Sequence, residues 1–213
     1  MGEKILIRQT GDSLIATFDK GNVSNNTLHS IYPLETNKSV SLYYLLGILN
    51  SKLLNWYYKI VNYLEVGKPM AEVKGIYLRK LPIAITDSIT MNNVENLVKN
   101  LIKLCETRYT TKHEFISFII NAYEPKKVSE QLEHFYTISF KDFCYEMRKQ
   151  KVKLSASQQM ALLPLYNERK NLIEQITIEI NSVQSSLDDM IFSIYNTPKS
   201  MADKIKQNIQ IDL

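Results

Sequence analysis

The sequence predicts an α+β protein, with a small mixed α/β unit followed by a helical region and a long C-terminal helix. Short apolar segments separated by turn residues fill the N-terminal part. From Ser88 onward, apolar residues recur at helical spacing, and the last such stripe continues from 157 to 195. We therefore expect an α/β unit over residues 1–87 and a helical region over 88–213.

The α/β unit begins with a predicted hairpin. Residues 4–9 (KILIRQ) and 13–18 (SLIATF) are rich in residues that favour strands. The intervening TGD is typical of a turn, because Gly11 can take positive φ and Asp12 can bond its own backbone. TLHSIYPL is a third candidate strand, and IYLRKLPI, stopped by Pro82, is a fourth.

A helix is predicted over residues 39–62, where Ser39 or Ser41 can cap its start. Its apolar stripe follows i, i+3, i+4, i+7 spacing and comprises Leu42, Leu45, Leu46, Leu49, Leu53, Trp56, Tyr57 and Ile60. We expect Trp56 and Tyr57 to lie in the core and Tyr58 to be exposed.

The polar triplet Asn50, Ser51 and Lys52 lies in the middle of this predicted helix. Asn50 or Ser51 can simply bond neighbouring backbone. Alternatively, the three residues face a polar partner, with Lys52 near phosphates. The sequence leaves both possibilities open.

The helical region is expected to contain a helix over 88–108, a helical insert over 109–154, a long helix over 157–195 and a tail. Within the insert, HEFISFIINAY and FKDFCYEMRKQ are amphipathic, and YEPKK follows the first of them as a break. The predicted buried stripe of the long helix comprises Leu165, Leu172, Ile176, Ile180, Val183, Leu187, Met190 and Ile194. The matching stripes predict that the two longer helices pack together.

Charge is unevenly distributed. Residues 1–85 hold ten Lys and Arg against six Asp and Glu, whereas residues 86–213 hold sixteen of each. A local positive excess favours an anionic partner. Since no apolar run approaches the roughly 18 residues of a membrane helix, we expect no membrane partner. Two cysteines far apart in sequence and outside any C-x-x-C pair favour a cytoplasmic location.

Several kinds of catalytic site are not supported by the sequence. The glycines never form G-x-G, no P-loop is present, and no adjacent prolines form an N-P-P-Y motif. Glu-x-Lys triplets occur three times, but without the companion carboxylates of a metal-dependent nuclease. Cys105 and Cys144 are expected to be reduced, buried thiols, and the histidines lack metal-ligand spacing.

Three stretches together resemble one family. LGILNSKLLNWYY, GKPMAEVKGIYLRKLPI and LDDMIFSIYNTP are similar, in this order, to motifs of the TaqI-like C-terminal specificity domain. The resemblance spans almost the whole chain, and Asn196 stands where the family usually has Gly at the end of the closing helix. Asn tolerates left-handed backbone, so it can still end the helix.

The resemblance implies a bacterial target-recognition domain of a bifunctional type II restriction enzyme or adenine-specific DNA methyltransferase. Double-stranded DNA is the implied partner, together with an upstream methyltransferase domain of the same parent chain. S-adenosylmethionine, and in some members a divalent metal, would be held upstream, so this segment is expected to contain no cofactor and to be non-catalytic.

Base reading is expected at loops and strand ends, because polar side chains must reach groove edges with defined geometry. The candidate DNA-binding residues are Arg8, Gln9, Thr10, Asp12, Asn50, Ser51, Lys52, Lys68, Lys74, Arg79 and Lys80. The main alternative is a helical protein–protein interaction module of a larger assembly. A complete small enzyme is the weakest of the three hypotheses.

Overall fold

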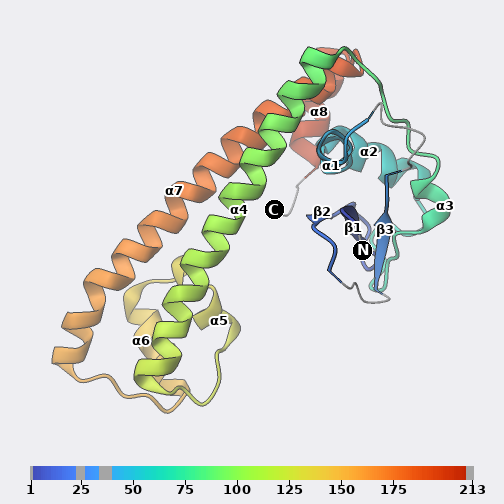
Figure 1. The fold of residues 1–213 in the computed structure, drawn as a ribbon. Helices are drawn as coiled ribbons and strands as arrows, with labels where there is room; N and C mark the ends of the chain where they lie inside the picture. Colours follow the sequence, from blue (N-terminus) through green and yellow to red (C-terminus); the bar gives the residue numbers. More distant parts are fainter. Residues whose placement is uncertain (1, 23–26, 34–39, 210–213) are drawn as a thin grey trace. The chain divides into compact units, whose positions relative to one another are not determined.

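The computed structural model describes residues 2–22, 27–33 and 40–209. It confirms the predicted α+β class, with a small antiparallel sheet and mainly helical structure elsewhere (Figure 1). The chain forms two compact units: unit 1 comprises Met1–Asn100 with Val183–Leu213, and unit 2 comprises Leu101–Ser182. The two longest helices therefore each contribute to both units, whereas the sequence predicts a division at 87/88.

The sheet of unit 1 has the order β2-β1-β3, and all its pairings are antiparallel. Its strands are β1 (Lys4–Arg8), β2 (Ala16–Asp19) and β3 (Leu28–Ile31). Ile5 and Ile7 alternate with Leu6 and are buried, because successive side chains of a strand face opposite sides. The predicted hairpin and third strand are thus confirmed.

The single helix predicted over 39–62 is wrong at its centre. The structure has α1 (Leu42–Leu49) and α2 (Lys52–Val61), and α1 packs on β1 and β2. Ser51 has an extended backbone, and its hydroxyl caps α2 by accepting the Leu54 N–H at 3.2 Å. Ser41 caps α1 as predicted, whereas Ser39 lies outside the described residues.

The aromatic residues of α2 differ from expectation in one case. Tyr58, expected to be exposed, is fully buried, while Trp56 and Tyr57 are half-buried. The Tyr58 hydroxyl accepts the Lys74 N–H at 3.2 Å, so its burial leaves the polar group bonded.

The predicted strand IYLRKLPI is also wrong, because its first residues form the short helix α3 (Gly75–Leu78). The extended pairing instead involves the segment just before it. Ala71 accepts the Gly11 N–H and Val73 donates to the Gln9 carbonyl, each at 2.7 Å. These bonds pair residues 71–73 with the backbone that continues β1.

Two long helices, α4 (Ser88–Tyr123) and α7 (Ala156–Ile194), follow. α4 extends beyond the predicted 88–108, because Phe115 and Ile119 continue its buried side. In unit 1, Gly47 of α1 lies against both helices: a Cβ there would be 2.8 Å from a Val98 methyl and 3.4 Å from a Leu187 methyl. Glycine thus permits this close packing.

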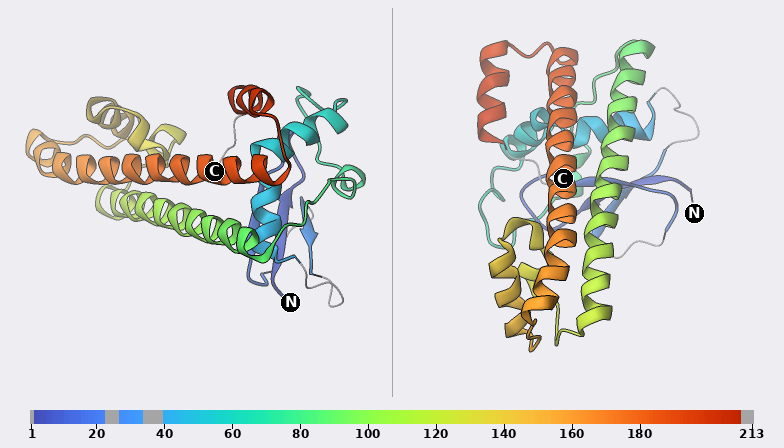
Figure 2. Two further views of the ribbon diagram at one scale, coloured as in Figure 1. Left: turned by 90° about the horizontal axis from the view of Figure 1, so that it is seen from above. Right: turned by 90° about the vertical axis from the view of Figure 1, so that its left-hand side faces the viewer.

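The end of α7 matches the prediction. Asn196 has φ +49°, and Thr197 donates its N–H to the Phe192 carbonyl at 2.9 Å, as in a Schellman motif. The expected tail instead contains α8 (Lys199–Asn208), which packs on α2 (Figure 2). Its buried Ala202 and Ile205 form too short a stripe to stand out among the surrounding charges.

Unit 2 contains α5 (Glu130–Glu133), a 3-10 turn at Phe135–Thr137 and α6 (Phe140–Lys149). Its core comprises Phe115, Ile119, Leu132, Phe135, Phe143, Met147, Leu154, Leu162, Tyr166 and Ile173. Here α4 and α7 share one apolar core. Leu172, predicted to be buried, is 37% exposed, whereas its neighbour Ile173 is fully buried.

Candidate nucleic-acid interface

The β1–β2 turn and the segment 59–80 form one surface of unit 1, which we call the turn–loop surface (residues 8–13 and 59–80). Thr10 and Glu72 form a β-bridge between the two segments. Lys59 Nζ lies 3.6 Å from the Asp12 carboxylate. Burial raises the pKa of Asp12, but hydrogen bonds from Ser13 and the Gly67 backbone, with the charge of Lys59, more than offset it, so the pKa is lowered.

Arg8 lies over the turn. Gly11 has φ +127°, and a Cβ at this position would lie 2.9 Å from the Arg8 guanidinium. Glycine is therefore needed for the backbone conformation, whereas a Cβ would only require the flexible end of the Arg8 side chain to shift. The side chains of Arg8 and Thr10 are exposed and that of Gln9 is half-buried, so the turn offers mixed polar groups at the surface.

The loop that follows α2 has its polar side chains inside. Asn62 and Glu65 are buried. Asn62 donates to the Tyr58 hydroxyl at 2.9 Å, and Glu65 accepts from Lys74 at 2.9 Å and from Lys68 at 3.2 Å. The hydrogen bond from Lys74, followed by that from Lys68, lowers the pKa of Glu65. The Glu65 carboxylate is thus a charged anchor for the loop.

The same loop exposes its apolar side chains. Tyr63 is 70% exposed and Met70 is 85% exposed, and Leu64 and Val66 are exposed as well. Sequence reasoning missed this feature. A loop that is held by buried polar groups while apolar groups face outward presents those apolar groups for contact.

The predicted residues of segment 59–80 are all at the surface. Lys68 and Lys74 are exposed but share the Glu65 carboxylate, so the trio carries only one net positive charge. Arg79 and Lys80 are exposed after α3, and the described part of the chain shows no ion pair for either. The structure therefore brings together Arg8, Gln9, Thr10, Asp12, Lys68 and Lys74, with Arg79 and Lys80 on the same segment.

Asn50 and Ser51 do not belong to this surface. The Asn50 amide accepts the Ala16 N–H at 2.9 Å and donates to the Ala16 carbonyl at 2.8 Å. Ser51 is fully buried, and its hydroxyl donates to the Ile48 carbonyl at 2.7 Å. The alternative of bonding to neighbouring backbone therefore holds for Ser51, whereas Asn50 bonds backbone 34 positions away. The DNA-binding assignment is corrected for both residues, because Ser51 is too deeply buried to reach a groove and the Asn50 amide is already bonded within the chain.

Lys52 is also held within unit 1. Its backbone N–H donates to the Asp188 carboxylate at 2.8 Å, and its Nζ donates to the Lys206 carbonyl at 3.1 Å. Burial raises the pKa of Asp188 to about 6, although the bond from Lys52 opposes the shift. Asp188 thus caps the first turn of α2 from another helix, and Lys52 links α2 to α8.

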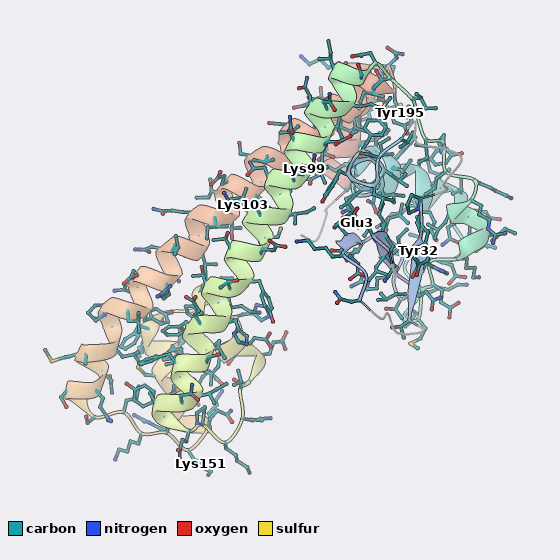
Figure 3. The ribbon with its side chains drawn as sticks, in the orientation of Figure 1. Glu3, Tyr32, Lys99, Lys103, Lys151 and Tyr195 are labelled. Atoms are coloured by element: carbon teal, nitrogen blue, oxygen red, sulfur yellow. The ribbon has the colours of Figure 1, made fainter. Side chains whose placement is uncertain are left out.

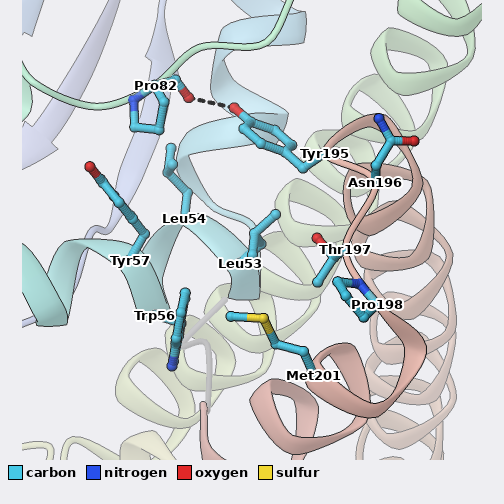
Figure 4. Close-up of a pocket in the computed structure, with 10 residues that line it drawn as sticks. All are labelled: Leu53, Leu54, Trp56, Tyr57, Pro82, Tyr195, Asn196, Thr197, Pro198 and Met201. Atoms are coloured by element: carbon cyan, nitrogen blue, oxygen red, sulfur yellow. Dashed lines mark hydrogen bonds between the residues drawn. The ribbon is translucent and has the colours of Figure 1, made fainter.

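A pocket of about 240 Å³ lies between α2 and the α7–α8 connection (Figure 4). Its lining comprises Leu53, Leu54, Trp56, Tyr57, Pro82, Tyr195, Asn196, Thr197, Pro198 and Met201. The Tyr195 hydroxyl donates to the Pro82 carbonyl at 2.5 Å and accepts the Ala84 N–H at 3.1 Å. Among the residues that the structure describes, the lining contains no carboxylate, histidine or cysteine that would indicate acid–base or nucleophilic chemistry.

Among the described residues, no three His, Cys, Asp or Glu side chains are grouped to hold a metal ion. Cys105 and Cys144 are free and half-buried, and burial raises the pKa of both thiols. None of the helices in the described ranges is long and apolar enough to cross a membrane.

Comparison with family models gave two adjacent matches. Residues 1–83 match the TaqI-like C-terminal specificity domain, and residues 87–191 match a domain of unknown function (DUF8810). The first match contains the turn–loop surface and the motifs at 45–57 and 67–83, but not LDDMIFSIYNTP, so it covers less of the chain than expected. Comparison with curated proteins and with solved structures gave no match. Residues 1–83 are thus similar to the TaqI-like C-terminal specificity domain, a family associated with DNA-sequence recognition in restriction–modification enzymes.

Proposed function

We propose that this chain is the sequence-reading part of a bifunctional type II restriction enzyme or adenine-specific DNA methyltransferase, and that the turn–loop surface contacts the DNA. The observation that carries the proposal is the pairing of Gln9 and Gly11 with Ala71 and Val73 inside the family match. In this pairing the polar side chains of a tight turn lie beside the loop that contains Lys68 and Lys74. Direct readout needs such polar groups on a rigid support.

The side chains of this surface suit different parts of a duplex. Arg8 can bind guanine and Gln9 adenine in bidentate fashion, while Tyr63 and Met70 offer apolar contact to thymine methyl groups. Arg79 and Lys80 suit phosphates, because neither is engaged in an ion pair within the described structure. Lys68 and Lys74 contribute less net charge, since Glu65 accepts from both.

We place catalysis outside this chain. The sequence has no glycine-rich turn for S-adenosylmethionine and no N-P-P-Y motif, so methyl transfer to adenine is assigned to an upstream domain of the parent. A divalent metal, where the parent cleaves DNA, would also be held upstream. The implied setting is the bacterial cytoplasm.

One observation favours the alternative of a protein-interaction module. The exposed apolar side chains of the loop, Tyr63, Leu64, Val66 and Met70, would also suit a protein partner. Salt dependence separates the two functions. Binding to a duplex weakens steeply as salt rises, because phosphate contacts release counterions, whereas an apolar protein interface does not.

The proposal is tested by selection from a pool of randomised duplexes with the whole chain, followed by anisotropy titration of the enriched duplex. We expect Arg8→Gln to change the enriched sequence, at about 1–3 kcal/mol per lost bidentate contact. Arg79→Gln with Lys80→Gln should weaken binding to all duplexes and reduce the salt slope by up to about two. Absence of any enriched sequence would refute the proposal.

The control for the phosphate variant is Lys199→Gln with Lys204→Gln, which removes the same charge from exposed positions of α8. We avoid substituting Lys68 and Lys74 together, because this would leave the buried Glu65 carboxylate without either cationic partner. Loss of binding in such a variant would report disruption of the loop as well as lost phosphate contacts.

A further inference from the structure

A concentrated basic patch lies in unit 2, although residues 86–213 together hold as many Asp and Glu as Lys and Arg. The loop after α4 contains Lys126 and Lys127, and the end of α6 with its following turn contains Arg148, Lys149, Lys151 and Lys153. The Lys126 N–H donates to the Gln150 carbonyl at 3.0 Å, which joins the two segments. We call these six residues the basic cluster.

The cations of the basic cluster are exposed and largely unopposed. All six are exposed, and the one ion pair that the described structure shows among them joins Lys149 to Glu146 at 2.6 Å. The hydrogen bond from Lys149 to Glu146 raises the Lys149 pKa. Because the other five cations have no carboxylate partner within the described residues, the patch has a strong local positive charge.

The fold fixes this arrangement. Val152 donates its N–H to the Met147 carbonyl at 2.9 Å, and Lys151 has φ +70°, so α6 ends in a Schellman motif. Met147 and Leu154, on either side of the turn, are buried in the unit 2 core. Figure 3 shows the Lys151 side chain at this turn. The cations are therefore carried on a well-anchored support.

Helix-end electrostatics do not account for the whole cluster. Cations near the last turn of α6 are stabilised by the helix dipole by about 0.3–1 kcal/mol each, which covers Arg148 and Lys149. Lys126, Lys127 and Lys153 come from outside the helix and add like-charge repulsion. A surface that gathers like charges in this way is suited to an anionic polymer.

We propose that the basic cluster is a second, sequence-independent contact for the backbone of duplex DNA. The choice of DNA among anionic partners rests on the proposed function. The binding chemistry is contact between ammonium or guanidinium groups and phosphates, with release of counterions. The cluster would supply general affinity, while the turn–loop surface supplies sequence preference.

The test measures binding of the whole chain to a random duplex of about 30 base pairs by anisotropy, from about 50 to 200 mM salt. The variant carries Lys126→Gln, Lys127→Gln, Lys151→Gln and Lys153→Gln. The control removes four exposed lysines elsewhere: Lys103→Gln, Lys141→Gln, Lys199→Gln and Lys204→Gln. Circular dichroism checks that each chain is folded, and Lys126→Gln with Lys127→Gln replaces the fourfold variant if that one is not.

We expect the fourfold variant to lose about tenfold or more in affinity at low salt and to reduce the salt slope by about 2–4, since each lost contact removes about 0.9. The twofold replacement should reduce the slope by about 1–2. The control should bind within about twofold of the parent chain. Equal loss in variant and control, or no binding of the random duplex by the parent chain at low salt, would overturn the inference.

Two further outcomes identify the partner of the basic cluster and separate its role from that of the turn–loop surface. If the cluster variant loses binding to phosphatidylserine vesicles while duplex binding is unchanged, the partner is a membrane surface and the inference is wrong. If no duplex sequence is preferred, yet the cluster variant loses random-duplex binding, the proposed function fails and the inference stands. If one duplex sequence is preferred but the cluster variant binds the random duplex as tightly as the parent chain, the proposed function stands and the inference fails.

Discussion

Asn50→Ala provides the sharpest test of how unit 1 is held together. The Asn50 amide bonds both backbone groups of Ala16, which lies on the edge strand β2. Alanine would leave the Ala16 N–H and C=O without these partners. With about 1–2 kcal/mol for each partly buried group, we expect the free energy of unfolding to fall by about 2–4 kcal/mol.

Urea denaturation followed by tryptophan fluorescence measures this change. Trp56 is the single tryptophan of the chain and lies on α2, so its emission reports on unit 1. For an m value of about 2 kcal/mol per molar urea, the midpoint should fall by about 1–2 M. Asn96→Ala, at an exposed position of α4, should change the free energy of unfolding by less than about 0.5 kcal/mol.

The same variant also distinguishes the two roles considered for Asn50. If Asn50 read DNA, Asn50→Ala would keep the parental midpoint and lose affinity for the selected duplex. That result would refute the structural role. Asn50→Asp refines the test, because a carboxylate can still accept from the Ala16 N–H but cannot donate to the Ala16 carbonyl. Its second oxygen would face that carbonyl oxygen and repel it, so the variant should also be less stable than the parent chain.

Three further predictions concern the packing of the helices. Burial raises the pKa of Asp188 to about 6, above its ordinary 3.8. The free energy of unfolding should therefore decline by up to about 3 kcal/mol as pH rises from about 4 to 6. Asp188→Asn should remove this decline, as measured by urea titrations at several pH values. A parental pH profile for that variant would contradict the assignment. Gly47→Val should overpack α1 against α4 and lower stability by about 1–3 kcal/mol, visible in Trp56 emission, whereas Gly2→Val, with open space around it, should not. Ile173→Asp should unfold unit 2 and expose it to protease, whereas Leu172→Asp should be tolerated. Equal protease resistance of the two variants would show that Ile173 does not pack in the core of unit 2.

The raised pKa of Asp188 gives the sign of the pH effect. Between the unfolded and folded pKa values, the folded chain holds a proton that the unfolded chain releases, so raising the pH in this window favours unfolding. Above about pH 6, both states are ionised and the contribution becomes constant. Asparagine keeps an oxygen for the Lys52 N–H but has no proton to release in this range.

Local signals in the sequence were sufficient for much of the fold. The apolar segments on either side of TGD predicted the hairpin, and the long apolar stripes predicted helices at α4 and α7. Such patterns are readable from sequence because they depend on residues only a few positions or helical turns apart. The left-handed end of α7 at Asn196 agrees with the resemblance, in which this position ends the closing helix, and with the tolerance of Asn for left-handed backbone. The motifs at 45–57 and 67–83 were sufficient to indicate the specificity-domain family of residues 1–83.

Tertiary structure decided the features that depend on distant partners. The break between α1 and α2 agrees with the bonds that Asn50 makes to Ala16, 34 positions away, which compete with a continuous helix. The extended pairing with the continuation of β1 is made by 71–73, and the start of the segment 76–83 lies in α3 instead of a strand. The basic cluster likewise depends on the contact between Lys126 and Gln150. Residue type and spacing encode local conformation, but which backbone groups and charges meet across the chain is set only when the apolar faces pack.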